Sequence, residues 1–183
     1  KQLLEEAHKR DIWIMVDVVA NHVAPVGTDY RDVKPFNDPS HYHDYCNIED
    51  KDWAENQWRV ENCRLANLPD LKQENEFVQN TLLNWIKDLI IKYDIDGIRI
   101  DTVPEVPKWF WKKFANSSGV FQIGEVFNGN ISYVSGYQRD SLDSVLNYPL
   151  FFTMRDCFGN KGSFYQMETV LKNIQSSFTD VDA

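Results

Sequence analysis

Several features that would assign this 183-residue chain to a common class are scarce or missing. No uninterrupted apolar run approaches the roughly 18 residues of a membrane-spanning helix, so we expect no membrane partner. Neither a Gly-x-Gly-x-x-Gly nor a phosphate-loop pattern occurs, which disfavours nucleotide binding. Basic residues number 19 against 28 acidic ones, giving a net charge of −9, so we expect no nucleic-acid partner. A neutral ligand or a cation suits this chain better.

The chain also lacks an initiator methionine and the charged-then-apolar pattern of a signal peptide. Residues 1–7 already have the pattern of an amphipathic helix interior. We therefore expect the sequence to be part of a longer protein.

Cysteine is rare, and Cys46, Cys63 and Cys157 do not form a disulfide-rich scaffold. A bridge between Cys46 and Cys63 would close a loop of about 18 residues and stabilise the fold by roughly 3 kcal/mol. Such a bridge indicates an oxidising, extracellular setting, and the Asn-x-Ser sequons at Asn116 and Asn130 point weakly the same way. Cys157 follows an apolar run and is expected to pack as a small apolar residue.

Strand-like and helical patterns alternate along the chain. Apolar spacing predicts helices over residues 1–10, Glu76–Tyr93, Lys108–Ala115 and Phe164–Phe178, and strands over Ile12–Val19, Ile98–Val103, Val120–Val126 and Val145–Leu150. The region between Val126 and Val145 is expected to be an irregular loop. Alternating strands and helices predict an α/β fold with a parallel sheet. Four strands would make half of an eight-stranded barrel, with a doubly wound open sheet as the alternative.

Residues 23–71 interrupt this alternation. They show no helical or strand periodicity and are rich in Pro, Asp, Asn, His and aromatic residues. Because a structureless loop of this length is rare in a compact domain, we expect an inserted subdomain with its own crosslinks. The remaining segments, 1–22 and 72–183, would then form the α/β part.

Polar residues gather where the predicted strands end, at Asn21 with His22, at Arg99 with Asp101, and at Glu125. Ligands of parallel α/β folds bind at that edge of the sheet. Arg99 and Asp101 lie two apart on a strand, so they share a face, and taken alone they are better explained by an ordinary strand-end ion pair. If the strands of Asp101 and Glu125 pair, their carboxyl groups can come within roughly 5–5.5 Å, the separation found in retaining glycosidases. Arg99 would keep Asp101 ionised as nucleophile, while a less compensated Glu125 would hold the proton.

Four segments together carry a resemblance to a known family. Asp17–His22, Leu68–Asp70, Gly97–Asp101 and Gly124–Val126 resemble, in order and spacing, hallmark segments of the α-amylase family of glycoside hydrolases, family 13, nearest to secreted fungal-type enzymes. The resemblance implies part of a (β/α)₈ TIM barrel, about strands 3 to 6, with residues 23–71 as an inserted calcium-binding subdomain. It implies hydrolysis of internal α-1,4-glucosidic bonds in starch or glycogen by a secreted enzyme that we expect to be monomeric.

The same resemblance implies roles for individual residues. Asp101 would be the nucleophile and Glu125 the general acid/base, with His22, Arg99 and Gly129 contacting substrate.

A calcium ion would be bound by the side chains of Asn21 and Asp70 and by the backbone carbonyls of Glu61 and Glu105, all hard oxygen ligands. The rival interpretation is zinc on His41, His43, Cys46 and Cys63, but this spacing fits no compact zinc finger. We expect His41 and His43 to be surface residues instead.

The family pattern is broken in two places. Family members usually have Lys-His shortly after the nucleophile, on the leaving-group side, whereas this chain has Pro104-Glu105. A third family carboxylate, an Asp behind a His on the seventh strand, does not occur in the sequence. We therefore expect the isolated chain to be unstable and inactive, because half a barrel leaves open sheet edges. An α-glucosidase or glucan transferase, or a non-catalytic amylase-like binding module, are the alternative functions.

Overall fold

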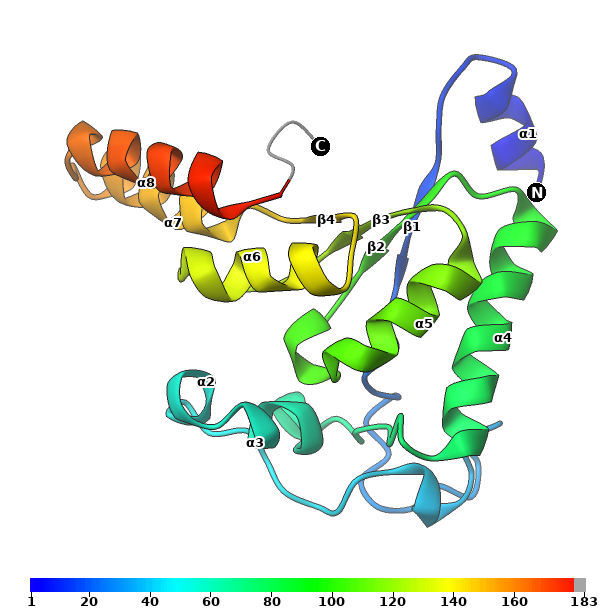
Figure 1. Cartoon of the computed structure of the whole chain (residues 1–183). Helices are drawn as coiled ribbons and strands as arrows, with labels where there is room; N and C mark the ends of the chain where they lie inside the picture. Colours follow the sequence, from blue (N-terminus) through cyan, green and yellow to red (C-terminus); the bar gives the residue numbers. More distant parts are fainter. Residues whose placement is uncertain (180–183) are drawn as a thin grey trace.

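The computed structural model describes residues 1–179, except for the side chain of residue 140, and contains one parallel sheet (Figure 1). The four strands follow in chain order β1-β2-β3-β4. They are β1 (Met15–Val18), β2 (Gly97–Ile100), β3 (Phe121–Gly124) and β4 (Ser144–Val145). The predicted α/β fold with parallel strands is confirmed.

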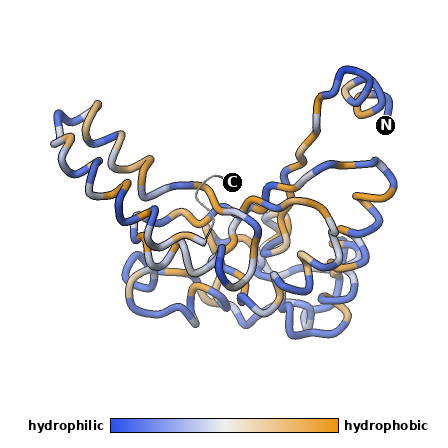
Figure 2. Tube along the Cα trace, turned by 45° about the horizontal axis from the view of Figure 1, so that its top comes forward, coloured by the Kyte–Doolittle hydropathy of each residue, from blue (hydrophilic) through white to orange (hydrophobic). Residues whose placement is uncertain are grey.

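Helices connect successive strands and form a hairpin after the last one (Figure 1). The helices outside the β1–α4 connection are α1 (Gln2–His8), α4 (Glu76–Tyr93), α5 (Lys108–Ser118), α6 (Ile131–Asp140), α7 (Tyr148–Gly159) and α8 (Phe164–Ser177). A short 3₁₀ turn, η3 (Val103–Glu105), follows β2. The α7–α8 hairpin and α1 project from the body of the molecule in two directions (Figure 2). None of the helices in residues 1–179 is long and apolar enough to cross a membrane.

One core joins the sheet to α4 and α5. Val18, Ile98 and Ile100 of the strands belong to the same buried cluster as one stripe of α4 and the aromatic face of α5. The buried helix residues are Val78, Leu82, Ile86 and Ile90 of α4 and Phe110, Trp111 and Phe114 of α5. The alternate strand positions Asp17, Arg99 and Asp101 therefore occupy the other, less covered face of the sheet.

Local sequence explains why α4 and α5 begin and end where they do. The Asn75 side chain accepts hydrogen bonds from the backbone N–H groups of Phe77 and Val78, a standard N-cap. Gly119 follows α5 with φ +64°, a left-handed conformation that glycine adopts without strain. A β-carbon at Gly124 would collide with the end of the Leu142 side chain, which packs closely against the end of β3.

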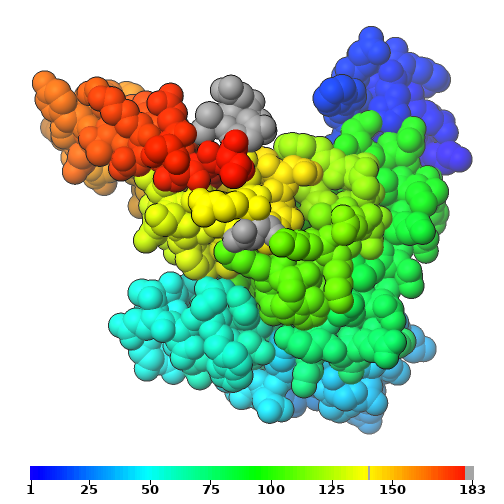
Figure 3. Space-filling view, in the orientation of Figure 1, coloured from blue at the N-terminus to red at the C-terminus, as the bar shows by residue number. Residues whose placement is uncertain are grey.

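The segment between β1 and α4 contains short helices that the sequence pattern did not predict. These are η1 (Pro39–His41), α2 (Asp52–Glu55), α3 (Gln57–Asn62) and η2 (Leu65–Asn67). The disulfide between Cys46 and Cys63 lies in this segment, as predicted, and Cys157 is a buried free cysteine. An antiparallel bridge pairs His22 with Asp70, so both ends of the segment meet beside β1. Figure 3 shows this segment packed below α5 and α6 (cyan and blue).

Three local predictions were wrong. The run Val145–Leu150 is not a strand: β4 ends at Val145, and α7 begins at Tyr148, with Asn147 as its N-cap and Pro149 in the first turn. The expected irregular loop before it contains α6, whose N-cap is Asn130. The first strand starts at Met15 rather than Ile12, so Ile12, Trp13 and Ile14 precede it.

Candidate active site

The backbone positions of Asp101 and Glu125 are fixed by the parallel ladder beyond the ends of their strands. The amide of Asp101 donates to the Val18 carbonyl at 2.9 Å, and the amide of Glu125 donates to the Ile100 carbonyl at 2.8 Å. Because Ile100 is in register with Gly124, the next residues along the two strands face each other. Asp101 and Glu125 are therefore neighbours at the carboxyl edge of the sheet.

The Arg99 guanidinium bridges these two carboxylates. Its Nη1 lies 2.6 Å from Asp101 Oδ1, and its Nη2 lies 2.7 Å from Glu125 Oε2. All three side chains are only 21–26% exposed. Charge-assisted hydrogen bonds of this length are among the stronger polar contacts in proteins. From the sequence, Arg99 was expected to pair with Asp101 alone. The expectation that the charge of Glu125 is less compensated by a cation was therefore wrong.

Two further residues complete this polar cluster and were not identified from the sequence. Asp17 Oδ1 accepts a hydrogen bond from Arg99 Nη1 at 2.8 Å, because residues 17 and 99 are register partners on adjacent strands. The Tyr148 hydroxyl at the start of α7 donates to Glu125 Oε1 at 2.9 Å. Burial lowers the pKa of Arg99, but the hydrogen bonds to Asp17 and Asp101 and the charge of Glu125 outweigh it and raise that pKa. The guanidinium is thus a permanent cation.

His22 lies beside this cluster at the end of β1. Burial lowers the pKa of its imidazole, although the charge of Asp101 acts in the opposite direction. The ring is therefore neutral near pH 7, when one nitrogen can donate and the other can accept a hydrogen bond. Its Nδ1 lies 3.2 Å from the Asn21 amide. Gly129 is exposed in the loop between β3 and α6, and no contact ties it to the carboxylates.

Asn21, which precedes His22, lies next to Asp70 and Glu105, and all three residues are buried. One terminal atom of the Asn21 amide lies 2.8 Å from Asp70 Oδ1 and 3.1 Å from the Glu105 carbonyl oxygen. If that atom is nitrogen, it donates to both oxygens. If it is oxygen, three oxygens converge with no hydrogen between them, which is the donor set that a hard cation such as Ca²⁺ prefers. The residues present therefore fit calcium.

The His43 imidazole lies between the carboxyl groups of Asp70 and Glu74. His43 Nδ1 lies 2.7 Å from Asp70 Oδ2, and His43 Nε2 lies 3.1 Å from Glu74 Oε2. Burial lowers the pKa of His43, but its hydrogen bonds to Asp70 and Glu74 prevail and raise the value to about 9. Burial raises the pKa of Asp70 to about 7, against the opposing effect of His43.

The prediction that His41 and His43 are surface residues was wrong. The side chain of His43 is 7% exposed, and His41 is buried against Phe77. The alternative zinc site loses its thiolates to the disulfide. Among residues 1–179, no group of three or more His, Cys, Asp or Glu side chains is arranged to hold a metal ion.

Glu61, the remaining predicted calcium ligand, lies on α3. Gln57 Nε2 on the same helix donates to Glu61 Oε1 and to the Pro104 carbonyl oxygen, both at 2.9 Å. Burial raises the pKa of Glu61, although the Gln57 hydrogen bond opposes the change. α3 is thereby fastened to η3, the segment that carries the Glu105 carbonyl.

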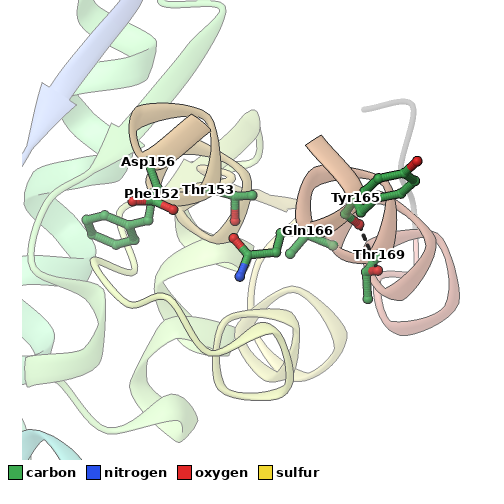
Figure 4. Close-up of a pocket in the computed structure, with 7 residues that line it drawn as sticks. Phe152, Thr153, Asp156, Tyr165, Gln166 and Thr169 are labelled. Carbon is green, nitrogen blue, oxygen red and sulfur yellow. Dashed lines mark hydrogen bonds between the residues drawn. The ribbon is translucent and has the colours of Figure 1, made fainter. Parts of the chain in front are cut away.

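Two hollows in the surface are candidates for ligand binding. One, of about 460 Å³, contains Glu125 and Glu105 in its wall. A larger one, of about 540 Å³, lies between α7 and α8 (Figure 4). The hydroxyl groups of Thr153 and Thr169 in the larger hollow donate to carbonyls of their own helices, and Asp156 is its single carboxylate. Of these two hollows, only the smaller one is lined by a residue of the polar cluster, Glu125.

Comparison with known proteins gives consistent matches. Residues 1–182 match the family model described as the alpha amylase catalytic domain. Alpha-amylase 2 of Schizosaccharomyces pombe is 39% identical over 170 residues, which is 88% of this chain and 29% of the yeast protein. The structure of an alpha-amylase from Malbranchea cinnamomea has a TM-score of 0.90 at 36% identity, covering 98% of this chain and 39% of that one. The alpha-amylase from Geobacillus thermoleovorans, solved in complex with acarbose, has a TM-score of 0.84 at 32% identity, covering 97% and 40%. The chain thus spans well under half the length of these relatives.

Proposed function

Because the chain belongs to the α-amylase catalytic-domain family and its four parallel strands match part of that TIM barrel, we propose that it supplies the nucleophile and the general acid/base of a retaining α-amylase. The full-length enzyme would cleave internal α-1,4-glucosidic bonds of starch or glycogen. The acarbose bound to the Geobacillus relative supports a glucan-like substrate. Residues 23–71 would form the inserted subdomain, and residues 1–22 and 72–183 would belong to the barrel.

The observation that carries this proposal is the Arg99 guanidinium held between Asp101 and Glu125. A retaining mechanism needs two carboxyl groups close together, one to attack and one to transfer a proton. Asp101 attacks the anomeric carbon while Glu125 gives its proton to the glycosidic oxygen, and the leaving sugar departs. Glu125 then takes a proton from water, and that water releases the sugar from Asp101. Arg99 keeps Asp101 ionised before it attacks and stabilises the carboxylate again when the sugar is released.

His22 and Gly129 would contact the sugar at the point of cleavage. A neutral, half-buried imidazole at a strand end suits hydrogen bonding to sugar hydroxyl groups, and the lowered pKa of His22 supports that form. Gly129 lies in an exposed loop four residues after Glu125, where its backbone is open to a ligand.

Calcium would be held by the side chains of Asn21 and Asp70 and by the carbonyl oxygens of Glu105 and Glu61. The convergence of Asn21, Asp70 and the Glu105 carbonyl supports the site. When bound, the ion supplies structural crosslinking and not chemistry at the sugar. These ligands come from the end of β1, the inserted segment and η3, so they join three parts of the chain. The disulfide supports a secreted location, since such bonds persist in oxidising compartments.

The proposal is tested in the full-length protein with Asp101→Asn and Glu125→Gln. We expect starch hydrolysis to fall by on the order of 10²–10⁴ for Glu125→Gln and at least as much for Asp101→Asn. Glu55→Gln, a change of the same kind at an exposed residue of α2, is the matched control. Nuclear magnetic resonance of fresh products should show the α-anomer. Undiminished hydrolysis by either active-site variant, or β-anomeric products, would refute the assigned roles. Products of maltooligosaccharide digestion separate an α-amylase from an α-glucosidase or a glucan transferase.

A further inference from the structure

The hydroxyl group of Tyr148 makes a hydrogen bond that the proposed mechanism does not use. It donates to Glu125 Oε1 at 2.9 Å, while Arg99 Nη2 lies 2.7 Å from the other carboxyl oxygen, Oε2. Glu125 also lines the hollow of about 460 Å³, so its carboxyl group faces space that a substrate can enter. The two oxygens of the proposed general acid therefore have different partners, a neutral phenol and a cation.

Three phenylalanine rings hold the Tyr148 ring in place. Phe127 packs edge-on against it with 4.8 Å between ring centroids, and Phe151 and Phe152 lie at 5.9 and 6.0 Å. Phe127 and Phe152 also contact each other at 5.3 Å, which closes the cluster. Aromatic pairs favour edge-to-face or offset contacts at about these separations. Packing therefore fixes the ring with its hydroxyl group directed at Glu125.

The backbone at this point is fixed as well. Tyr148 is the first residue of α7, and the Asn147 side chain caps the helix by accepting a hydrogen bond from the Leu150 N–H at 3.1 Å. Pro149 occupies the first turn, where its restricted φ suits a helix start. The hydrogen bond to Glu125 is thus made by a side chain that is ordered at both its backbone and its ring.

The hydroxyl group of Tyr148 stays protonated beside this carboxylate. Burial raises the pKa of Tyr148, and the hydrogen bond and charge of Glu125 raise it further, whereas the charge of Arg99 lowers it. The phenol is therefore a donor at neutral pH. Four other ionisable side chains surround this pair or its guanidinium partner, and a variant that lacks only the phenol oxygen keeps all of them: Asp17, Arg99, Asp101 and Glu105.

The two partners of Glu125 determine which of its oxygens carries the proton. A guanidinium has donors and no acceptor, so an O–H on Oε2 finds no partner in Arg99. At Oε1 the phenol donates to the lone pair that remains free, so this oxygen keeps its partner with or without a proton. That hydrogen bond is weaker while Oε1 is protonated and roughly twice as strong once the oxygen is charged. The contact with Tyr148 therefore strengthens as the proton leaves.

We propose that Tyr148 is a positioning residue for proton transfer, which makes Oε1 the oxygen of Glu125 that gives up the proton and stabilises the charge left there. The inference rests on the proposed function and deepens it, since that function does not distinguish the two oxygens. As the glycosidic carbon–oxygen bond breaks, the proton moves from Oε1 to the leaving oxygen, and its electron pair stays on Oε1. When water attacks, its proton returns to Oε1, and Tyr148 keeps its own proton throughout. Contacts that strengthen as charge develops lower the barrier.

The test is the pH dependence of kcat/KM for maltopentaose in the full-length protein. Tyr148→Phe removes the hydroxyl group and keeps the ring among its phenylalanine neighbours. Without this donor, Glu125 holds its proton to higher pH and gives it up less readily. We expect the alkaline limb of the profile to move up by about one pH unit, and kcat/KM below that limb to fall by up to about 10-fold.

Two further variants sharpen the test. A ring-fluorinated tyrosine at position 148 is a stronger acid and a stronger donor, so the alkaline limb should move to lower pH, opposite to Tyr148→Phe. Tyr45→Phe is the matched control, because the Tyr45 hydroxyl also donates to a side-chain oxygen, Asn67 Oδ1 at 3.1 Å, but lies in the inserted segment. Its profile should match wild type.

The outcomes are distinguishable. An alkaline limb of Tyr148→Phe that coincides with wild type, or an equal loss at every pH, would overturn the inference, because a purely structural role does not move the limb. If Tyr148→Phe does not fold, as judged by its thermal unfolding, an unmoved limb in the fluorinated protein overturns it instead. Starch hydrolysis that survives Glu125→Gln refutes the proposed function. An enzyme that needs Glu125 but keeps its profile without the Tyr148 hydroxyl group refutes this inference alone.

Discussion

Replacing Arg99 with lysine tests whether one guanidinium holding two carboxylates is the basis of activity. Arg99 reaches Asp101 through Nη1 and Glu125 through Nη2, whereas an ammonium group is a single point that can hold only one of them. A hydrogen bond between charged groups contributes about 1.5–3 kcal/mol, and each 1.4 kcal/mol corresponds to a tenfold change in rate. Losing one of the two bonds should therefore lower kcat by about 10- to 100-fold, with KM changed much less.

Arg99→Met removes the contacts with Asp101, Glu125 and Asp17 and leaves three carboxylates around an apolar side chain. The interacting side chains of Asp101 and Glu125 are about one quarter exposed, and that of Asp17 is 65% exposed, so solvent screens part of the effect. We expect a loss of roughly 10²–10³-fold, measured as the initial rate of reducing-end release from soluble starch.

Arg31→Lys is the matched control, because Arg31 also forms a short ion pair, with Asp29, but its side chain is 85% exposed. Thermal unfolding of all variants separates a loss of catalysis from a loss of fold. An Arg99→Lys enzyme with wild-type kcat, or an equal loss in Arg31→Lys, would refute the reasoning.

Two further predictions concern stability of the full-length protein. Chelation of calcium should lower the melting temperature by about 5–10 °C, since a ligand at 100 times its Kd stabilises by about 2.7 kcal/mol; equal melting temperatures in EDTA and in calcium would contradict the metal site. The hydrogen bond that the His8 imidazole donates to Asp96 raises the pKa of His8, although burial opposes it. This pair therefore stabilises the fold below the ordinary histidine pKa, and its contribution is lost as pH rises through the raised value. Urea unfolding of His8→Gln should therefore show a smaller stability difference between pH 5 and pH 9 than wild type, and an identical difference would exclude the pair as a cause.

The sequence predicts best where periodicity and capping agree. The apolar spacing of residues 76–93 fits one helical face, and the α4 bounds are the same as those predicted, because Asn75 caps the first turn. The prediction of a strand over Val145–Leu150 was wrong for the opposite reason. A short apolar run has no period that separates a strand from a buried helix start, and the Asn147-x-Pro149 pattern was the signal that favoured a helix.

In the candidate site, contacts within one strand could be predicted from the sequence, whereas contacts between strands could not. Arg99 and Asp101 could be paired from the sequence because residues two apart on a strand share a face. The contacts of Arg99 with Asp17 and Glu125 depend on the register between strands, which the sequence does not give. Tyr148 contacts Glu125 from the first turn of α7, and the sequence placed Tyr148 in a strand instead. The contacts that the sequence did not predict therefore depend mostly on the register between strands and on the residue at which a helix begins.

Glu105 connects the proposed calcium site with the hollow beside Glu125. Its carbonyl oxygen faces the Asn21 amide at 3.1 Å, while its side chain lines the hollow beside Glu125. The other η3 carbonyls are also engaged, since Trp111 Nε1 donates to Val103 at 2.9 Å and Gln57 Nε2 donates to Pro104 at 2.9 Å. A segment whose carbonyls are fastened in this way moves as a unit, so a displacement at Asn21 must also move the Glu105 side chain that lines the hollow with Glu125. Asn21→Ala should therefore lower the initial rate of starch hydrolysis at temperatures well below those at which the protein unfolds.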